Sequence, residues 1–215
     1  MILFRNRDAA VRKRQSASKF LFVGNHPCLD FINTEMIQQG HPVDLLGSFG
    51  DLIAWLVQAQ LLDVTEAREV TGRWGGQRES VRLFEQVKGF RAGLRAAVER
   101  IAAGRTVPPS TLSAINELLR RRVGYTQLVR GRGGFERKFR SESNGADRLL
   151  VPLAEAASDL LCDGDLSLIK RCSNAACILY FYDTTKNHGR RWCSMRLCGN
   201  RMKVAAHYRR GRSKG

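Results

Sequence analysis

Four of the six cysteines form two pairs in the last quarter of the chain. Cys172 and Cys177 are separated by four residues, Cys193 and Cys198 are also separated by four, and fifteen residues lie between the pairs. Thiolates bind Zn²⁺ tetrahedrally, and two close pairs joined by an excursion of this length bring the chain to one metal ion twice. The spacing therefore predicts one zinc ion bound by all four thiolates.

Other interpretations of these cysteines explain less of their spacing and surroundings. Buried apolar thiols need no matched spacing, and the flanking residues are cationic. A redox couple is more typical of a single C-x-x-C beside a βαβ pattern, which this sequence lacks. His188 is an alternative ligand by its spacing from Cys193. Because four thiolates leave no open coordination position, the zinc is expected to hold structure and not to activate water.

Positive charge is concentrated around the cysteines. The chain carries 36 Lys and Arg against 20 Asp and Glu, and residues 166–215 hold 12 of the cations with a single acid, Asp183. A concentrated positive field attracts polyanions, so this region is expected to bind nucleic acid, with double-stranded DNA as the first choice. Some arginines would instead balance the negative charge of a zinc ion bound to four thiolates. The predicted nucleic-acid contacts are Arg190, Arg191, Asn200, Arg201, Lys203, Arg209 and Arg210.

The roles of Asn200 and Arg201 stay open between reading a base edge and supporting the zinc site or the helix end. RNA is the alternative partner, because aromatic rings among basic residues can stack unpaired bases. The small core of a zinc finger accounts for those rings better than base stacking does. They are Tyr180, Phe181, Tyr182 and Trp192.

A third reading gives the N-terminal part a small-molecule or enzymatic role. Asp30 and Asn33 are polar residues in an apolar setting and, with Trp55, form a candidate ligand pocket for an unknown effector. The sequence has no glycine-rich phosphate loop, no G-x-S-x-G and no H-E-x-x-H. The protein is therefore expected not to be an enzyme.

The elements that must position these residues follow from periodicity. Apolar residues at helical spacing predict helices over 51–62, 65–74, 80–103, 110–122 and 147–161. Alternation over 125–129 and 135–139 around GRGG predicts a β-hairpin. A short strand is expected over 20–23, then a turn, then a strand or helix from Cys28. The predicted fold class is α+β, with a mainly helical N-terminal domain that contains a small sheet.

Composition divides the chain into three parts. Residues 1–18 are basic and aperiodic and predict a flexible arm, residues 19–165 predict the helical domain, and residues 166–215 predict the zinc finger. In the finger, a hairpin is expected between the two cysteine pairs. A helix should follow Cys198 with Met202, Ala205 and Ala206 facing inward, which makes a treble-clef-like arrangement with the last ligand at the helix start.

The segment RRWCSMRLCGNRMK, preceded by C-x4-C and FYDTTKN, resembles the CGNR zinc finger, a bacterial module, over about residues 168–210. The resemblance implies zinc held by the four cysteines and a role in DNA binding. In that family the finger commonly follows an ABATE-type domain, described as a stress-induced transcription regulator. The stretch CLDFINTE and the helix around Trp55 are similar to the start of that domain. The resemblance thus implies a bacterial transcription regulator. Ligand sensing by the N-terminal domain is a separate hypothesis, which rests on the candidate pocket.

Two further observations concern the compartment. No segment approaches the roughly 18 apolar residues that a membrane helix needs. The first residues, MILFRNRDAAVRKRQSASK, lack the apolar stretch of a secretory signal. We therefore expect a cytoplasmic protein with no membrane partner, in which reduced cysteines are available to bind metal.

Overall fold

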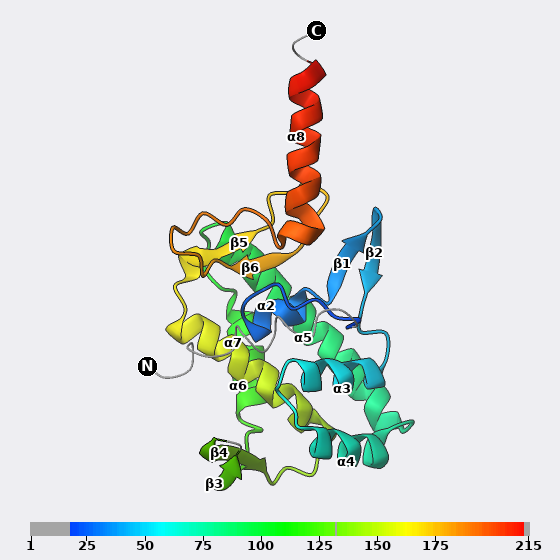
Figure 1. Cartoon of the computed structure of the whole chain (residues 1–215). Helices are drawn as coiled ribbons and strands as arrows, with labels where there is room; N and C mark the ends of the chain where they lie inside the picture. Colours follow the sequence, from blue (N-terminus) through cyan, green and yellow to red (C-terminus); the bar gives the residue numbers. More distant parts are fainter. Residues whose placement is uncertain (1–17, 132, 213–215) are drawn as a thin grey trace.

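The computed structural model describes residues 18–131 and 133–212, with the side chains of 207 and 209–212 outside the description. The predicted arm over 1–18 lies outside the described residues except for its last residue. Helices dominate the described chain, and each described sheet is a two-stranded antiparallel hairpin (Figure 1). The predicted α+β, mainly helical fold is confirmed.

The N-terminal domain is built around one long helix, α5. Its apolar residues recur every three or four positions, so one face of the helix is buried along its length. This face contacts α2, α3 and α6, and α7 packs on α2 and α6. None of the helices in the described ranges is long and apolar enough to cross a membrane. The helices of this domain are α2 (Pro27–Ile32), α3 (Phe49–Gln58), α4 (Val64–Trp74), α5 (Arg78–Ala102), α6 (Pro109–Leu119) and α7 (Val151–Asp163).

Helices α3 and α4 start slightly earlier than predicted because their capping side chains lie earlier in the chain. Ser48 accepts a hydrogen bond from the backbone N–H of Asp51 and caps α3, so Asp51 lies in the first turn. Asp63, not Thr65, caps α4 in the same way. A 3₁₀ turn (η1, Ala146–Leu150) leads into α7. Each difference is a shift of a few residues at the end of a helix that periodicity located correctly.

The hairpin predicted around GRGG is confirmed as β3 (Gly124–Gly131) and β4 (Gly134–Ser141). A second hairpin, β1 (Glu35–Gln38) and β2 (His41–Asp44), was not predicted. Its two-residue turn places both central residues at positive φ, which the glycine of the Gln-Gly pair favours. The buried guanidinium of Arg91 on α5 fixes this hairpin through hydrogen bonds to Asp44, Glu35 and Thr34.

The strand predicted over 20–23 is wrong, because this segment pairs with no other strand in the described chain. Its alternation has a different cause. Phe20 and Phe22 pack against the core of the N-terminal domain, whereas Leu21 and Val23 pack against the apolar cluster around the cysteines. The extended segment is therefore held between two cores, and both of its faces are apolar for that reason.

The C-terminal finger contains β5 (Ile169–Arg171) and β6 (Tyr180–Tyr182), which pair antiparallel. A π-helical turn (η3, Met195–Gly199) leads into α8 (Asn200–Arg212). The hairpin differs from the prediction, because it encloses the first cysteine pair and does not lie between the two pairs. Helix α8 projects away from the rest of the molecule (Figure 1), so the predicted inward position of Ala205 is wrong and that residue is exposed. The treble-clef arrangement stays a prediction.

Candidate metal centre and nucleic-acid interface

The four predicted cysteines converge in the finger. Two of them lie in the loop between β5 and β6, Cys193 lies just before the η3 turn that leads into α8, and Cys198 lies within that turn. All four are buried, and their Sγ atoms lie within 4.8 Å of one another. The Sγ atoms of Cys177 and Cys193 are 3.9 Å apart, close to the roughly 3.8 Å edge of a tetrahedron with Zn–S bonds of about 2.3 Å. The site fits one structural zinc ion.

Groups that hydrogen-bond the sulfurs complete this centre. The amide Nδ2 of Asn174 donates to Sγ of Cys198 at 3.3 Å, and the backbone N–H of Cys193 donates to Sγ of Cys172 at 3.4 Å. Such donors favour the thiolate form that zinc requires. Asn174 was not singled out in the sequence, although its place inside the first cysteine pair is a signal for this role.

Asp183 organises the segment between the two cysteine pairs. Its fully buried carboxylate accepts hydrogen bonds from Lys170 Nζ at 2.8 Å, from the hydroxyl of Thr185 at 2.6 Å and from the backbone N–H of Arg190 at 3.0 Å. Burial alone would raise the pKa of Asp183, but these donors hold that pKa well below its usual range. Asp183, the single acidic residue of the sequence 166–215, thus fixes the loop that leads to Cys193.

Replacing Asp183 with asparagine is expected to lower the free energy of unfolding by about 2–3 kcal/mol, because a carboxamide accepts fewer of these bonds and turns an N–H₂ toward cationic donors. Since the pKa is depressed in the folded protein, the carboxylate stabilises above about pH 4 and its contribution is lost only below that pH. Urea unfolding at pH 7 measures the change. Asp165→Asn, at an exposed carboxylate, serves as the control, and equal losses in the two variants would contradict the assignment.

The finger is docked on the N-terminal domain through strand β6. The side-chain amide of Asn33 pairs with the backbone of Tyr180 in both directions, donating to the carbonyl at 2.7 Å and accepting from the N–H at 2.9 Å. Asn25 Nδ2 donates to the carbonyl of Tyr182 at 3.1 Å. Arg95 Nη1 on α5 donates to the carbonyl of Ile178 at 3.1 Å. The two parts therefore share a buried, hydrogen-bonded contact.

The three residues of the predicted ligand pocket, Asp30, Asn33 and Trp55, are all engaged in packing contacts, and the pocket stays a prediction. Asn33 is fully buried and uses its amide to hold the finger. Asp30 is buried, accepts from the backbone N–H of Gly24 at 2.7 Å, and burial raises its pKa to about 7. Trp55 is fully buried and stacks on Phe22 with ring centroids 6.1 Å apart. All three side chains belong to the packing between and within the domains.

Arg190, a predicted phosphate contact, is engaged within the protein, and its phosphate-binding role stays a prediction. Its guanidinium donates to the carbonyl of Val23 at 2.7 Å, to that of Trp192 at 3.1 Å and to that of Cys193. It also lies over the ring of Phe181, 4.1 Å from the centroid. Arg190 therefore ties the metal-binding segment to the N-terminal domain and places its positive charge beside the cysteines.

Other predicted nucleic-acid contacts are accessible. Arg191, Asn200, Arg201 and Lys203 are exposed, and Arg201 Nε donates to the carbonyl of Leu197 at 2.8 Å. The side chains of Arg209 and Arg210 lie outside the described residues. Of the rings proposed to stack RNA bases, Tyr180 is 4% and Phe181 is 0% exposed. These two rings belong to the cores, which removes half of the aromatic set on which the RNA alternative depended.

Helix α8 begins at the metal centre and carries no acidic residue along its 13 residues. Its first residue, Asn200, lies two positions after Cys198, so the positive end of the helix dipole lies near the thiolates. The basic residues toward its other end suit the negative end of the dipole. A zinc ion at the helix start would thus fix the direction in which this basic helix projects.

Comparison with known families gives two matches. The family ABATE, "Putative stress-induced transcription regulator", matches residues 25–164. The family CGNR zinc finger matches residues 169–211. The first match covers more than half of the chain, and the second includes all four cysteines and most of α8. No curated protein matches the chain.

Proposed function

Because this chain belongs to the ABATE family and carries a CGNR zinc finger, we propose that it is a zinc-dependent transcription regulator that binds duplex DNA through the finger. The role as a regulator rests on the family, and the contact with DNA rests on the charge and exposure of α8. The proposal places the protein in the bacterial cytoplasm and assigns no catalytic step to it.

The observation that carries the proposal is the projecting helix. A helix of 13 residues is about 20 Å long, and the major groove of B-DNA admits a helix of this width. Lys203 on α8 is exposed, as are Asn200 and Arg201 at its start. These side chains can reach phosphates and base edges, whereas the buried rings of the finger support the metal site.

The test is the salt dependence of DNA affinity. Fluorescence anisotropy with a labelled random duplex is expected to show affinity that falls steeply as NaCl rises, because bound phosphates release counterions. Lys203→Ala is expected to reduce the slope of log K against log[NaCl] by about 0.9, one phosphate contact. Arg68→Ala removes an exposed cation from α4, far from the finger in Figure 1, and should leave the slope unchanged.

Two results would contradict the proposal. An affinity that does not change between low and moderate salt would exclude phosphate contacts. Binding that survives removal of zinc by a chelator would show that the finger is not the DNA-contacting part. Competition by single-stranded RNA in the same assay separates duplex DNA from the RNA alternative, because only stacking on unpaired bases would favour the single strand.

A further inference from the structure

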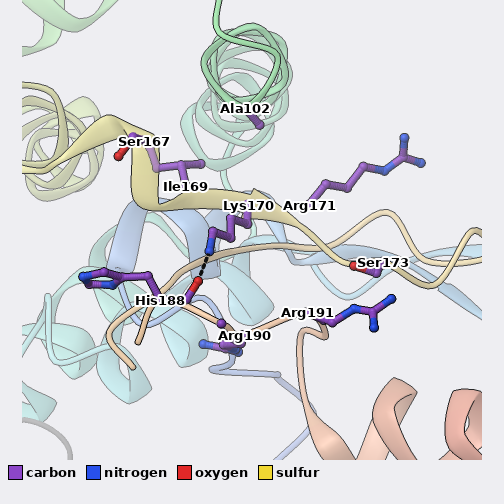
Figure 2. A pocket seen from close by; sticks show the side chains of 10 residues that line it. Ala102, Ser167, Ile169, Lys170, Arg171, Ser173, His188, Arg190 and Arg191 are labelled. Carbon is purple, nitrogen blue, oxygen red and sulfur yellow. Dashed lines mark hydrogen bonds between the residues drawn. The ribbon is translucent and has the colours of Figure 1, made fainter. Parts of the chain in front are cut away.

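A groove of about 430 Å³ lies where the finger meets the C-terminal end of α5. Figure 2 shows its lining, to which β5, the segment before Cys193 and one residue of α5 contribute. Four of the lining residues are Lys or Arg, and none is acidic. The lining residues are Ala102, Ser167, Ile169, Lys170, Arg171, Ser173, His188, Gly189, Arg190 and Arg191.

Two of the four cations are engaged within the protein. The Lys170 ammonium is paired with the buried Asp183 and also donates to the carbonyl of His188. Arg190 donates to three backbone carbonyls and lies beside the metal centre, where its charge compensates the thiolates. Neither group is available to a ligand without breaking contacts that hold the finger together.

Arg171 and Arg191 remain accessible at one end of the groove. Both are exposed, and within residues 18–131 and 133–212 no hydrogen bond or ion pair holds either guanidinium. Arg191 lies over the Trp192 ring, 5.4 Å from its centroid. Figure 2 shows the two arginine side chains extending on the same side, with Ser173 between them. The backbone N–H of Ser173 donates to the carbonyl of Arg191 at 2.8 Å, which fixes the two segments beside each other.

We propose that Arg171, Arg191 and the hydroxyl of Ser173 bind a phosphate group. This inference rests on the proposed function and deepens it, since a phosphate of the DNA backbone is the ligand that it implies. Guanidinium groups present several donors in one plane and match phosphate oxygens in pairs. Because the buried Asp183 is already neutralised by Lys170, the charge at this end of the groove is free to attract an anion.

The groove and α8 are two separated points of the same finger. A duplex that is held at both points would be fixed in orientation, since contacts to phosphates position a protein on DNA. Arg171 precedes Cys172, and Arg191 precedes Trp192 and Cys193. The zinc ion would therefore set the distance between these two arginines, because it fixes the two cysteines that follow them.

The first experiment compares Arg171→Ala/Arg191→Ala with Arg68→Ala/Arg82→Ala in the full zinc-loaded chain. Arg68 and Arg82 are exposed and lie on α4 and α5, so the control loses the same charge away from the groove. The groove variant is expected to lower the salt slope for a labelled duplex by about 1.8, two phosphate contacts. The control should change it far less. The two double variants could instead show equal salt slopes while Lys203→Ala still lowers the slope. That result would overturn the phosphate site in the groove and leave the proposed function standing.

The second experiment uses inorganic phosphate and does not depend on DNA. In ¹H–¹⁵N spectra at constant ionic strength, the Ser173 amide signal is expected to shift saturably with phosphate in the wild type and not in the groove variant. If the wild type fails to bind duplex, the proposed function fails, and saturable shifts would then assign the groove to a free phosphorylated molecule. Shifts that equal those with chloride, or that persist in the groove variant, would overturn the inference.

Discussion

Removing zinc is expected to unfold the finger and to leave the helices of the N-terminal domain folded. The apolar cluster of the finger has six buried members, Cys172, Cys177, Leu179, Phe181, Cys193 and Cys198. Four of the six are the metal ligands. Without the ion, the cluster loses the bonds that join its two halves, and a segment of this size has too little other apolar surface to fold alone. Structural zinc contributes roughly 10–16 kcal/mol in small fingers.

The measurement is a pair of ¹H–¹⁵N spectra before and after a chelator. Signals of the finger are expected to collapse to the range of unfolded chains, and those of α5 and α7 to stay dispersed. Cys198→Ser should give the same result without a chelator. Cys162→Ser is the matched control, because Cys162 is exposed and outside the metal centre. Finger signals that stay dispersed without metal would show that the fold does not depend on the ion.

The second large effect is expected at Asn33. Asn33→Ala leaves the N–H and the carbonyl of Tyr180 without their partner in a buried position. An unsatisfied buried group costs about 1–3 kcal/mol, so the free energy of unfolding should fall by about 2–5 kcal/mol. Urea unfolding followed by far-UV circular dichroism measures it in the zinc-loaded protein.

Asn25→Gly provides the comparison for Asn33, because Asn25 lies at φ +59°, where glycine is unstrained and alanine is not. Its amide also bonds the carbonyl of a β6 residue, but this contact is exposed, so water replaces the lost donor. The loss there is expected to stay below about 1 kcal/mol. Equal losses at Asn25 and Asn33 would mean that the docking of β6 does not depend on the buried amide.

Spacing and periodicity predicted the parts of the molecule that depend on local sequence. The cysteine pairs predicted the metal centre, because ligand spacing is set by the metal itself. The long helix α5 was evident because one face stays apolar along its length. The hairpin β3–β4 was evident because a glycine-rich turn separates two alternating runs.

Contacts between side chains and distant backbone groups could not be predicted from the sequence. The sequence favours a pocket role for Asn33, because its partner, the backbone of Tyr180, has no signature in the sequence. It favours a phosphate contact for Arg190, because the carbonyl of Val23 that accepts from Arg190 has no signature either. The segment 20–23 has the alternation of a strand, but the second apolar face is covered by the finger. Only the docked structure distinguishes these cases.

The docking of β6 also has a consequence for the order in which the chain folds. Asn33 and Tyr180 are 147 residues apart in sequence, so the contact forms only after most of the chain has been synthesised. Closing so long a loop costs conformational entropy and slows folding. Until the finger leaves the ribosome and acquires its metal, the buried faces around Asn33 and Val23 stay open to water and to other chains. Metal supply during synthesis would therefore control how long this nascent protein is exposed to aggregation.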